Sequence, residues 1–178
     1  MKEEEFVLKI IRQHWIKDDG IFDCEDVCSH GEVFVNIANE ILSDEHSGSW
    51  SLSTAGLYLL RSLNQDCDFN QFSNQLIPCC GDFMIPDENG DNYVTILGCP
   101  KGIDFKITHR EGFVHLETIN SSKIQMPFNL YKNSIIKFVN LVEEFYGNLD
   151  NKKVEDEMYR KCFKQFWAEW YELKNKWI

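Results

Sequence analysis

The sequence lacks long hydrophobic runs, since no stretch of its 178 residues approaches the ~18 apolar residues of a membrane span. It has only four prolines and no polar low-complexity tract, which argues against a disordered chain. The N-terminal residues MKEEEFVLKIIRQHW lack the basic region and the uninterrupted apolar region of a secretory signal. We therefore expect a cytoplasmic protein that folds as one domain over residues 1–178.

Catalytic and nucleotide-binding motifs are also missing. No G-x-S-x-G, phosphate-binding loop, H-E-x-x-H or Rossmann glycine pattern is present. Carboxylates are numerous, but no spacing singles out a pair for acid–base work. The sequence therefore favours a binding protein over an enzyme and implies no cofactor.

Positive charge is scarce. The chain has 18 Lys and Arg against 29 Asp and Glu, a net charge of −11. Residues 150–178 carry seven basic and six acidic side chains, so the negative charge belongs to residues 1–149. Such a field repels nucleic acid and anionic lipid, and it speeds encounter with a basic protein. We expect a basic protein partner, no nucleic acid and no membrane; ordinary solubility is the alternative explanation.

The densest run of acids lies in residues 17–32, KDDGIFDCEDVCSHGE. We call residues 18–32 the acidic segment, because it contains no Lys or Arg and six carboxylates: Asp18, Asp19, Asp23, Glu25, Asp26 and Glu32. Ser29 and Glu32 match a capping box, which assigns Glu32 to a helix start. The candidate partner-binding acids are the remaining five, Asp18, Asp19, Asp23, Glu25 and Asp26. A solvated loop is the alternative.

Two cysteine patterns suggest other functions. Cys24, Cys28 and His30 offer three zinc ligands, but a structural site wants four and the fourth would lie far along the chain. Such a zinc-stabilised module is one alternative, although no metal is predicted. Cys79 or Cys80 with His109 or His115 as base would make a small thiol enzyme, yet nothing nearby in sequence lowers a thiol pKa. Seven cysteines, an odd number, indicate reduced and mostly buried thiols.

Hydrophobic spacing predicts an α+β fold. It predicts N-terminal helices at about 3–16, 29–42 and 51–63, strands between about 75 and 127, and C-terminal helices at 130–146 and 152–176. The strands are short, rich in β-branched and aromatic residues, and separated by turn residues. We expect an antiparallel four- or five-stranded meander flanked by the N-terminal and C-terminal helices.

The C-terminal stretch QFWAEWYELKNKWI is rich in aromatics. Packing of one helix over the sheet or the other helices accounts for most of them. The alternative interpretation is that Trp167 and Trp170 are exposed and bind a partner, because Trp and Tyr are frequent at interfaces.

Several stretches resemble, in their order, a known class of proteins: SWSLSTAGLYLLRSL, NQLIPCCGDFMI, GCPKGIDFKITHREGFVHLE and LYKNSIIKFVNLVEEFY. Together with the acidic, Trp-rich composition, this layout is similar to immunity proteins of bacterial contact-dependent and polymorphic toxin systems. The plan of a sheet followed by a helix is loosely similar to the SUKH type, over roughly residues 50–147. The resemblance implies a non-enzymatic inhibitor that binds one cognate toxin domain, often a nuclease, and blocks its active site. It assigns no role to any single residue.

Overall fold

The first part of the chain forms an antiparallel sheet. The computed structural model describes residues 5–16, 25–69, 75–81, 83–86 and 93–178. The first four strands are β1 (Phe6–His14), β2 (His30–Ile37), β3 (Glu40–Ser43) and β4 (Trp50–Ser51). The strand order is β1-β2-β3, and β4 also pairs with β2. The helices predicted over 3–16 and 29–42 are therefore wrong.

Side-chain alternation explains why β2 is a strand. Val33, Val35 and Ile37 are fully buried, whereas the residues between them are half-buried. A period of two places these side chains on one face of a pleat. The two residues after β2, Ala38 and Asn39, have φ of 53° and 66°, which is the backbone that a two-residue hairpin turn into β3 requires.

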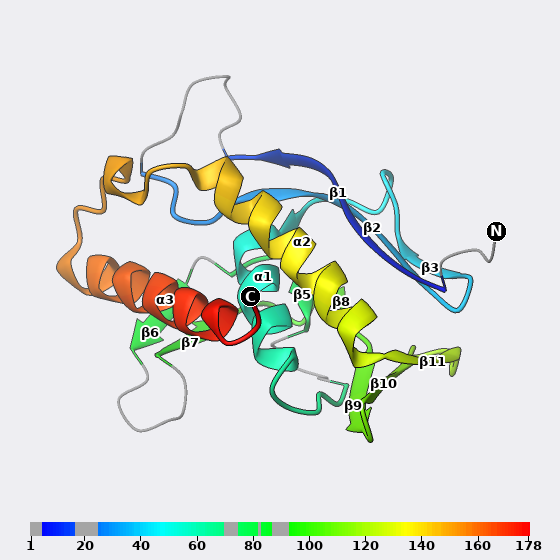
Figure 1. Cartoon of the computed structure of the whole chain (residues 1–178). Coiled ribbons are helices and arrows are strands. Elements are labelled where there is room, and N and C mark those ends of the chain that lie inside the picture. The colour runs from blue at the N-terminus through cyan, green and yellow to red at the C-terminus, as the bar shows by residue number, and fades with distance from the viewer. Residues whose placement is uncertain (1–4, 17–24, 70–74, 82, 87–92) are drawn as a thin grey trace.

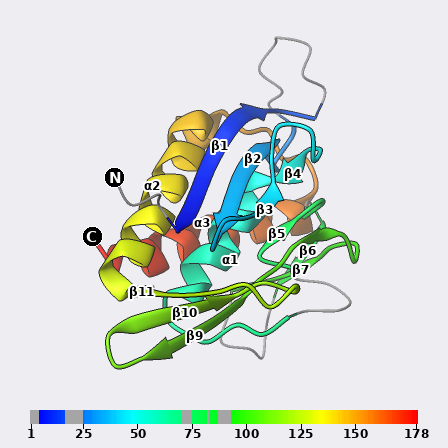
Figure 2. The ribbon, with the colours of Figure 1, turned by 90° about the vertical axis from the view of Figure 1, so that its right-hand side faces the viewer.

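Helix α1 (Leu52–Ser62) is the centre of the core and confirms the helix predicted at 51–63. All of its residues except Arg61 are buried. A helix that is covered all round must have neighbours on every side. Figures 1 and 2 show α1 behind the sheet of β1 and β2 and beneath the two C-terminal helices.

The strands predicted between residues 75 and 127 are confirmed, but they do not form one meander. They are β5 (Ile77–Pro78), β6 (Phe83–Pro86), β7 (Val94–Leu97), β8 (Gly102–Ile103), β9 (Lys106–Arg110), β10 (Phe113–Glu117) and β11 (Lys123–Pro127). β9, β10 and β11 make a three-stranded sheet, whereas β5 pairs with β8 and β6 pairs with β7. Glu111 and Gly112, with φ of 49° and 83°, form the expected β9–β10 turn.

The C-terminal helices also match the prediction. They are α2 (Phe128–Tyr146) and α3 (Glu157–Asn175), with a short 3-10 turn at Leu149–Asn151 between them. Asp156 caps α3, because its carboxylate accepts the Tyr159 amide at 2.8 Å. α2 packs on β1, β11 and α1, and α3 packs on β6, β7 and α1. The fold is thus α+β, with helices over antiparallel sheets.

Two close contacts join α1 to α3. Arg61 Nε and one Arg61 Nη donate to the two carboxylate oxygens of Glu169, at 2.7 Å and 2.9 Å. One turn earlier on α1, Gly56 faces the Trp170 ring, and a Cβ atom at residue 56 would overlap that ring. A glycine is needed here because of this close approach.

Candidate partner-binding site

Most of the acidic segment lies in the connection between β1 and β2, and its last three residues, 30–32, begin β2. His14 at the end of β1 is the register partner of His30 at the start of β2. The segment therefore leaves from and returns to one end of a strand pair. Asp18, Asp19, Asp23 and Cys24 lie outside the described residues, whereas Glu25 and Asp26 lie within them.

Asp26 connects the two ends of this segment. One of its carboxylate oxygens accepts the backbone N–H of Ile16 at 2.7 Å, and the other accepts that of Cys28 at 3.0 Å. Asp26 was expected to contact a partner, but both of its oxygens are bonded within the chain. Its carboxylate therefore links the backbone just after β1 to the backbone just before β2.

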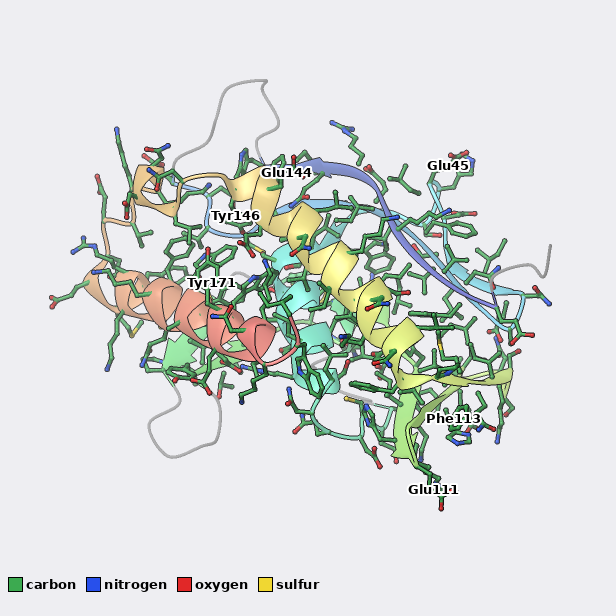
Figure 3. All side chains as sticks on the ribbon, viewed as in Figure 1. Glu45, Glu111, Phe113, Glu144, Tyr146 and Tyr171 are labelled. Atoms are coloured by element: carbon green, nitrogen blue, oxygen red, sulfur yellow. A yellow bond between two sulfur atoms is a disulfide. The ribbon has the colours of Figure 1, made fainter. Side chains whose placement is uncertain are left out.

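The returning end is fixed by Tyr146, the last residue of α2. The Tyr146 hydroxyl donates to the carbonyl of Val27 and accepts from the N–H of Ser29, both at 2.9 Å. Tyr146 is buried (Figure 3), and burial raises the pKa of its hydroxyl, so the group stays neutral and can serve as both donor and acceptor.

The departing end is fixed by Trp15, whose side chain is buried. Its ring lies 4.8 Å from the Phe145 ring and 4.9 Å from the Tyr146 ring, measured between centroids. The ammonium of Lys152 covers the same indole at 3.1 Å and donates to the backbone carbonyl of Asp26. A cation over an indole face is an attractive arrangement. We call Trp15, Asp26, Tyr146 and Lys152 the anchor of the acidic segment.

Sequence reasoning missed three of these four residues. Tyr146 and Lys152 are more than 110 residues away from the groups that they bond. Trp15 was assigned to a helix face that does not exist. The sequence shows both Trp15 and the aromatic end of residues 130–146, but no spacing rule predicts a contact between residues so far apart in the chain.

The remaining acids of the segment differ in their surroundings. Glu25 is exposed. Glu32 lies in β2 opposite Arg12 of β1, so the capping-box role predicted for it is wrong. The register that makes β2 a strand also places Glu32 beside a basic residue, where cross-strand opposite charges are favourable.

Trp167 and Trp170 are buried, with 4% and 0% of their surface exposed. Their rings lie 5.0 Å apart, and the Trp167 ring lies 4.8 Å from that of Tyr146. The prediction that these two residues bind a partner directly is therefore wrong. The helix face was already needed to cover α1, and Trp167 supports Tyr146 from behind.

The thiol-enzyme alternative finds no support in the described residues. Cys79 forms a disulfide with Cys99, which also corrects the expectation of seven reduced thiols. His109 pairs through Nδ1 with Asp66 at 3.0 Å, and His115 lies opposite Thr108 within the β9–β10 sheet.

The cysteine of the acidic segment that the structure describes is a poor metal ligand. Cys28 is buried against hydroxyl groups, with its Sγ 2.8 Å from the Ser51 Oγ and 3.4 Å from that of Ser53. Burial raises the pKa of Cys28 from 9.0 to about 11, against the opposing effect of these hydrogen bonds. Because the thiolate is the metal-binding form, the zinc site proposed on Cys24, Cys28 and His30 loses its central ligand.

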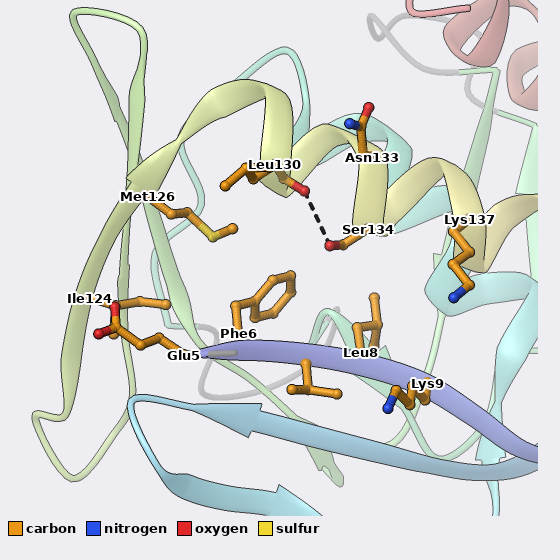
Figure 4. A pocket seen from close by; sticks show the side chains of 11 residues that line it. Glu5, Phe6, Leu8, Lys9, Ile124, Met126, Leu130, Asn133, Ser134 and Lys137 are labelled. Atoms are coloured by element: carbon orange, nitrogen blue, oxygen red, sulfur yellow. Dashed lines mark hydrogen bonds between the residues drawn. The ribbon is translucent and has the colours of Figure 1, made fainter. Parts of the chain in front are cut away.

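A groove lies at the opposite end of β1, between that strand, β11 and α2 (Figure 4). Its volume is about 520 Å³. Phe6, Leu8, Met126 and Leu130 supply apolar surface, and Lys9 and Lys137 stand at its rim. The Ser134 hydroxyl in its wall donates to the carbonyl of Leu130 at 3.1 Å, within its own helix. These lining side chains are suited to contact rather than to covalent chemistry.

Comparison with known proteins found no matching family model, no matching curated protein and no matching solved structure. Within the described part of the chain, no helix combines the length and the apolar character that crossing a bilayer requires. The chain is thus an α+β protein with an anchored acidic connection between its first two strands.

Proposed function

We propose that this protein is an immunity-type inhibitor that binds a basic toxin domain through the acidic segment. The observation that carries the proposal is the anchor, in which Asp26, Tyr146 and Lys152 bond the backbone at both ends of the segment. Charged side chains on a fixed base lose less freedom on binding than the same side chains on an unrestrained loop. A nuclease domain is a fitting target, because the cleft that holds nucleic acid is basic.

Charge sets the speed and the selectivity of such an encounter. A net charge of −11 attracts a basic protein over a long range and repels the nucleic acid that competes for the same cleft. Tight contact then needs apolar surface beside the acids. Ile16, at the departing end of the acidic segment, is 58% exposed and supplies part of that surface.

The test uses the product of the adjacent gene as the candidate toxin. Cells that make this product should grow only when they also make the inhibitor. The double variant Asp18→Lys/Asp23→Lys changes the net charge to −7 and should lose both rescue and complex formation. The control Glu45→Lys/Glu111→Lys makes the same change in net charge at exposed sites far from Tyr146 (Figure 3), and it should rescue as the wild type does.

Two outcomes contradict the proposal. One is equal rescue by the two double variants, which would show that the acidic segment has no special role in binding. The other is an adjacent gene product that is harmless by itself or that does not bind the chain. Circular dichroism of both variants checks that a loss of rescue is not a loss of folding.

A further inference from the structure

Two short antiparallel ladders lie between residues 77 and 103. β5 pairs with β8 at one end, through Pro78 and Gly102, and β6 pairs with β7 at the other, through Phe83 and Leu97. Between the two ladders the chain is outside the assigned strands. This part of the chain contains three cysteines, Cys79 and Cys80 after β5 and Cys99 before β8, which we call the three-cysteine cluster.

The three sulfur atoms all lie within 4.8 Å of one another, and all three residues are half-buried. The backbone N–H of Cys99 points to the Cys80 sulfur at 3.1 Å. A hydrogen bond of this kind stabilises a thiolate and orients it, as outer partners do around bound metal ions. Cys79 donates its own N–H to the carbonyl of Lys101 at 3.0 Å, so the backbone on both sides of the cluster is bonded together.

The spacing of the backbone favours a bridge that is longer than a disulfide. The Cα atoms of Cys79 and Cys99 lie 7.1 Å apart. Disulfide partners usually have Cα atoms about 4.4–6.8 Å apart. Two thiolates on one tetrahedral zinc ion have sulfur atoms about 3.8 Å apart, given Zn–S bonds of about 2.3 Å, and therefore allow a wider backbone separation.

We propose that the reduced three-cysteine cluster binds one Zn²⁺ ion through the thiolates of Cys79, Cys80 and Cys99. Thiolates are the ligands that zinc and other soft ions prefer. Among the described residues this group supplies three ligand atoms, so a water molecule completes the tetrahedron on the exposed side. The ion joins the segment between β5 and β6 to the segment between β7 and β8, next to the strands β6 and β7 that pack on α3.

Reduction of the Cys79–Cys99 disulfide requires a thiol or a phosphine as the reductant. A phosphine attacks the Cys79–Cys99 disulfide and leaves as its oxide, with the oxygen and two protons taken from water, which yields two thiols. Zn²⁺ then displaces one proton from each of the three thiols. A small-molecule disulfide that re-forms the Cys79–Cys99 bond, and is itself reduced to two thiols, would release the ion, because only one thiolate would remain.

The test measures metal binding by the full chain after reduction with a phosphine. We expect one Zn²⁺ per chain. Cobalt in its place should give sulfur-to-cobalt charge-transfer absorption. Alkylation followed by peptide mapping should show that Zn²⁺ protects Cys79, Cys80 and Cys99.

Matched variants assign the site. Cys80→Ser keeps the pair that forms the disulfide and removes the third ligand, so its oxidised form should melt as the wild type does. Its affinity for Zn²⁺ should fall by about tenfold or more, since even loss of an outer-shell partner costs 10–100-fold. Cys67→Ser, at a half-buried cysteine outside the cluster, should bind Zn²⁺ like the wild type.

The inference is overturned if the reduced chain takes up no Zn²⁺, if Cys80→Ser binds it with unchanged affinity, or if Zn²⁺ protects none of the three cysteines. The first of these results would leave the cluster with a structural disulfide only. None of these outcomes depends on the acidic segment, since the measurement needs no protein partner.

Discussion

The ammonium of Lys152 lies 3.1 Å from the centre of the Trp15 ring. These residues come from opposite ends of the chain, one from the end of β1 and the other from the turn before α3. The contact closes the core over the departing end of the acidic segment. It also places a positive charge beside the backbone of Asp26, in a segment that has no Lys or Arg of its own, and this charge offsets part of the repulsion among the carboxylates.

Replacing Lys152 with Gln should lower the free energy of unfolding by about 1–2 kcal/mol, because a partly desolvated cation–π contact is worth up to about that much. Lys153→Gln, at the exposed neighbouring residue, removes the same charge without the contact and should change stability little. Urea denaturation of the two variants makes the comparison. Equal losses would mean that the ring contact contributes nothing.

Removing the hydroxyl of Tyr146 should be costly. Tyr146→Phe leaves the N–H of Ser29 and the carbonyl of Val27 without that partner, and we expect a loss of about 3 kcal/mol. Tyr131→Phe is the matched control, since that buried hydroxyl bonds only the Ser62 side chain, which also donates to Leu59. Its loss should be about 1 kcal/mol. Hydrogen exchange should rise at Ser29 in the first variant alone.

The buried ion pair between Arg61 and Glu169 predicts a non-additive result. Glu169→Leu leaves the Arg61 guanidinium buried without its carboxylate, and should cost about 3–5 kcal/mol. The double variant Arg61→Met/Glu169→Leu removes both charges and should be more stable than Glu169→Leu alone. Thermal and chemical unfolding of the wild type, Arg61→Met, Glu169→Leu and the double variant gives the coupling. A double variant whose loss equals the sum of the two single losses would exclude it.

Cys28 predicts a loss of stability at high pH. Its pKa is raised by burial from 9.0 to about 11, so the folded state favours the neutral thiol. This contribution is fully present below pH 9 and disappears as the pH rises toward 11, with a total of about 3 kcal/mol. The free energy of unfolding of Cys28→Ala should fall less steeply between those two pH values. Parallel slopes for the variant and the wild type would contradict the assignment.

The salt dependence of association should show whether the acidic segment steers the encounter with the partner. Association of the wild type should slow as ionic strength rises, because surface charges are screened beyond about 8–10 Å. The variant Asp18→Lys/Asp23→Lys should associate more slowly at low salt and show a flatter dependence. Stopped-flow measurement over a salt series tests this. An unchanged slope would place the binding surface elsewhere on the chain.

The fold class and the second half of the chain could be predicted because their signals are local. The helix at 130–146 has an apolar stripe, and the β9–β10 turn contains Glu111 and Gly112 in the backbone that such a turn favours. The first two strands were misjudged for a physical reason. Phe6 and Ile10 fit a helical spacing, while Phe6 and Leu8 fit an alternating one, and only pairing with β2 decides between them.

The candidate site was half predictable. Its charge is visible in the sequence, because residues 18–32 contain six carboxylates and no Lys or Arg. Its support is not, because Trp15, Tyr146 and Lys152 meet only after β1 has paired with β2 and α2 has packed on β1. Trp167 shows the opposite error. It is buried in the core, but from the sequence alone it was predicted to contact a partner at the surface.

The irregular register of β1 between Ile10 and Arg12 has a consequence for behaviour at high concentration. Of the described strands, only β2 pairs with β1, so its other edge can recruit a strand from a second molecule. A bulge twists such an edge, and the exposed lysine at position 9 makes it a poor template for further pairing. We therefore expect the bulge and Lys9 to disfavour the growth of fibrils from the edge of β1 (Phe6–His14).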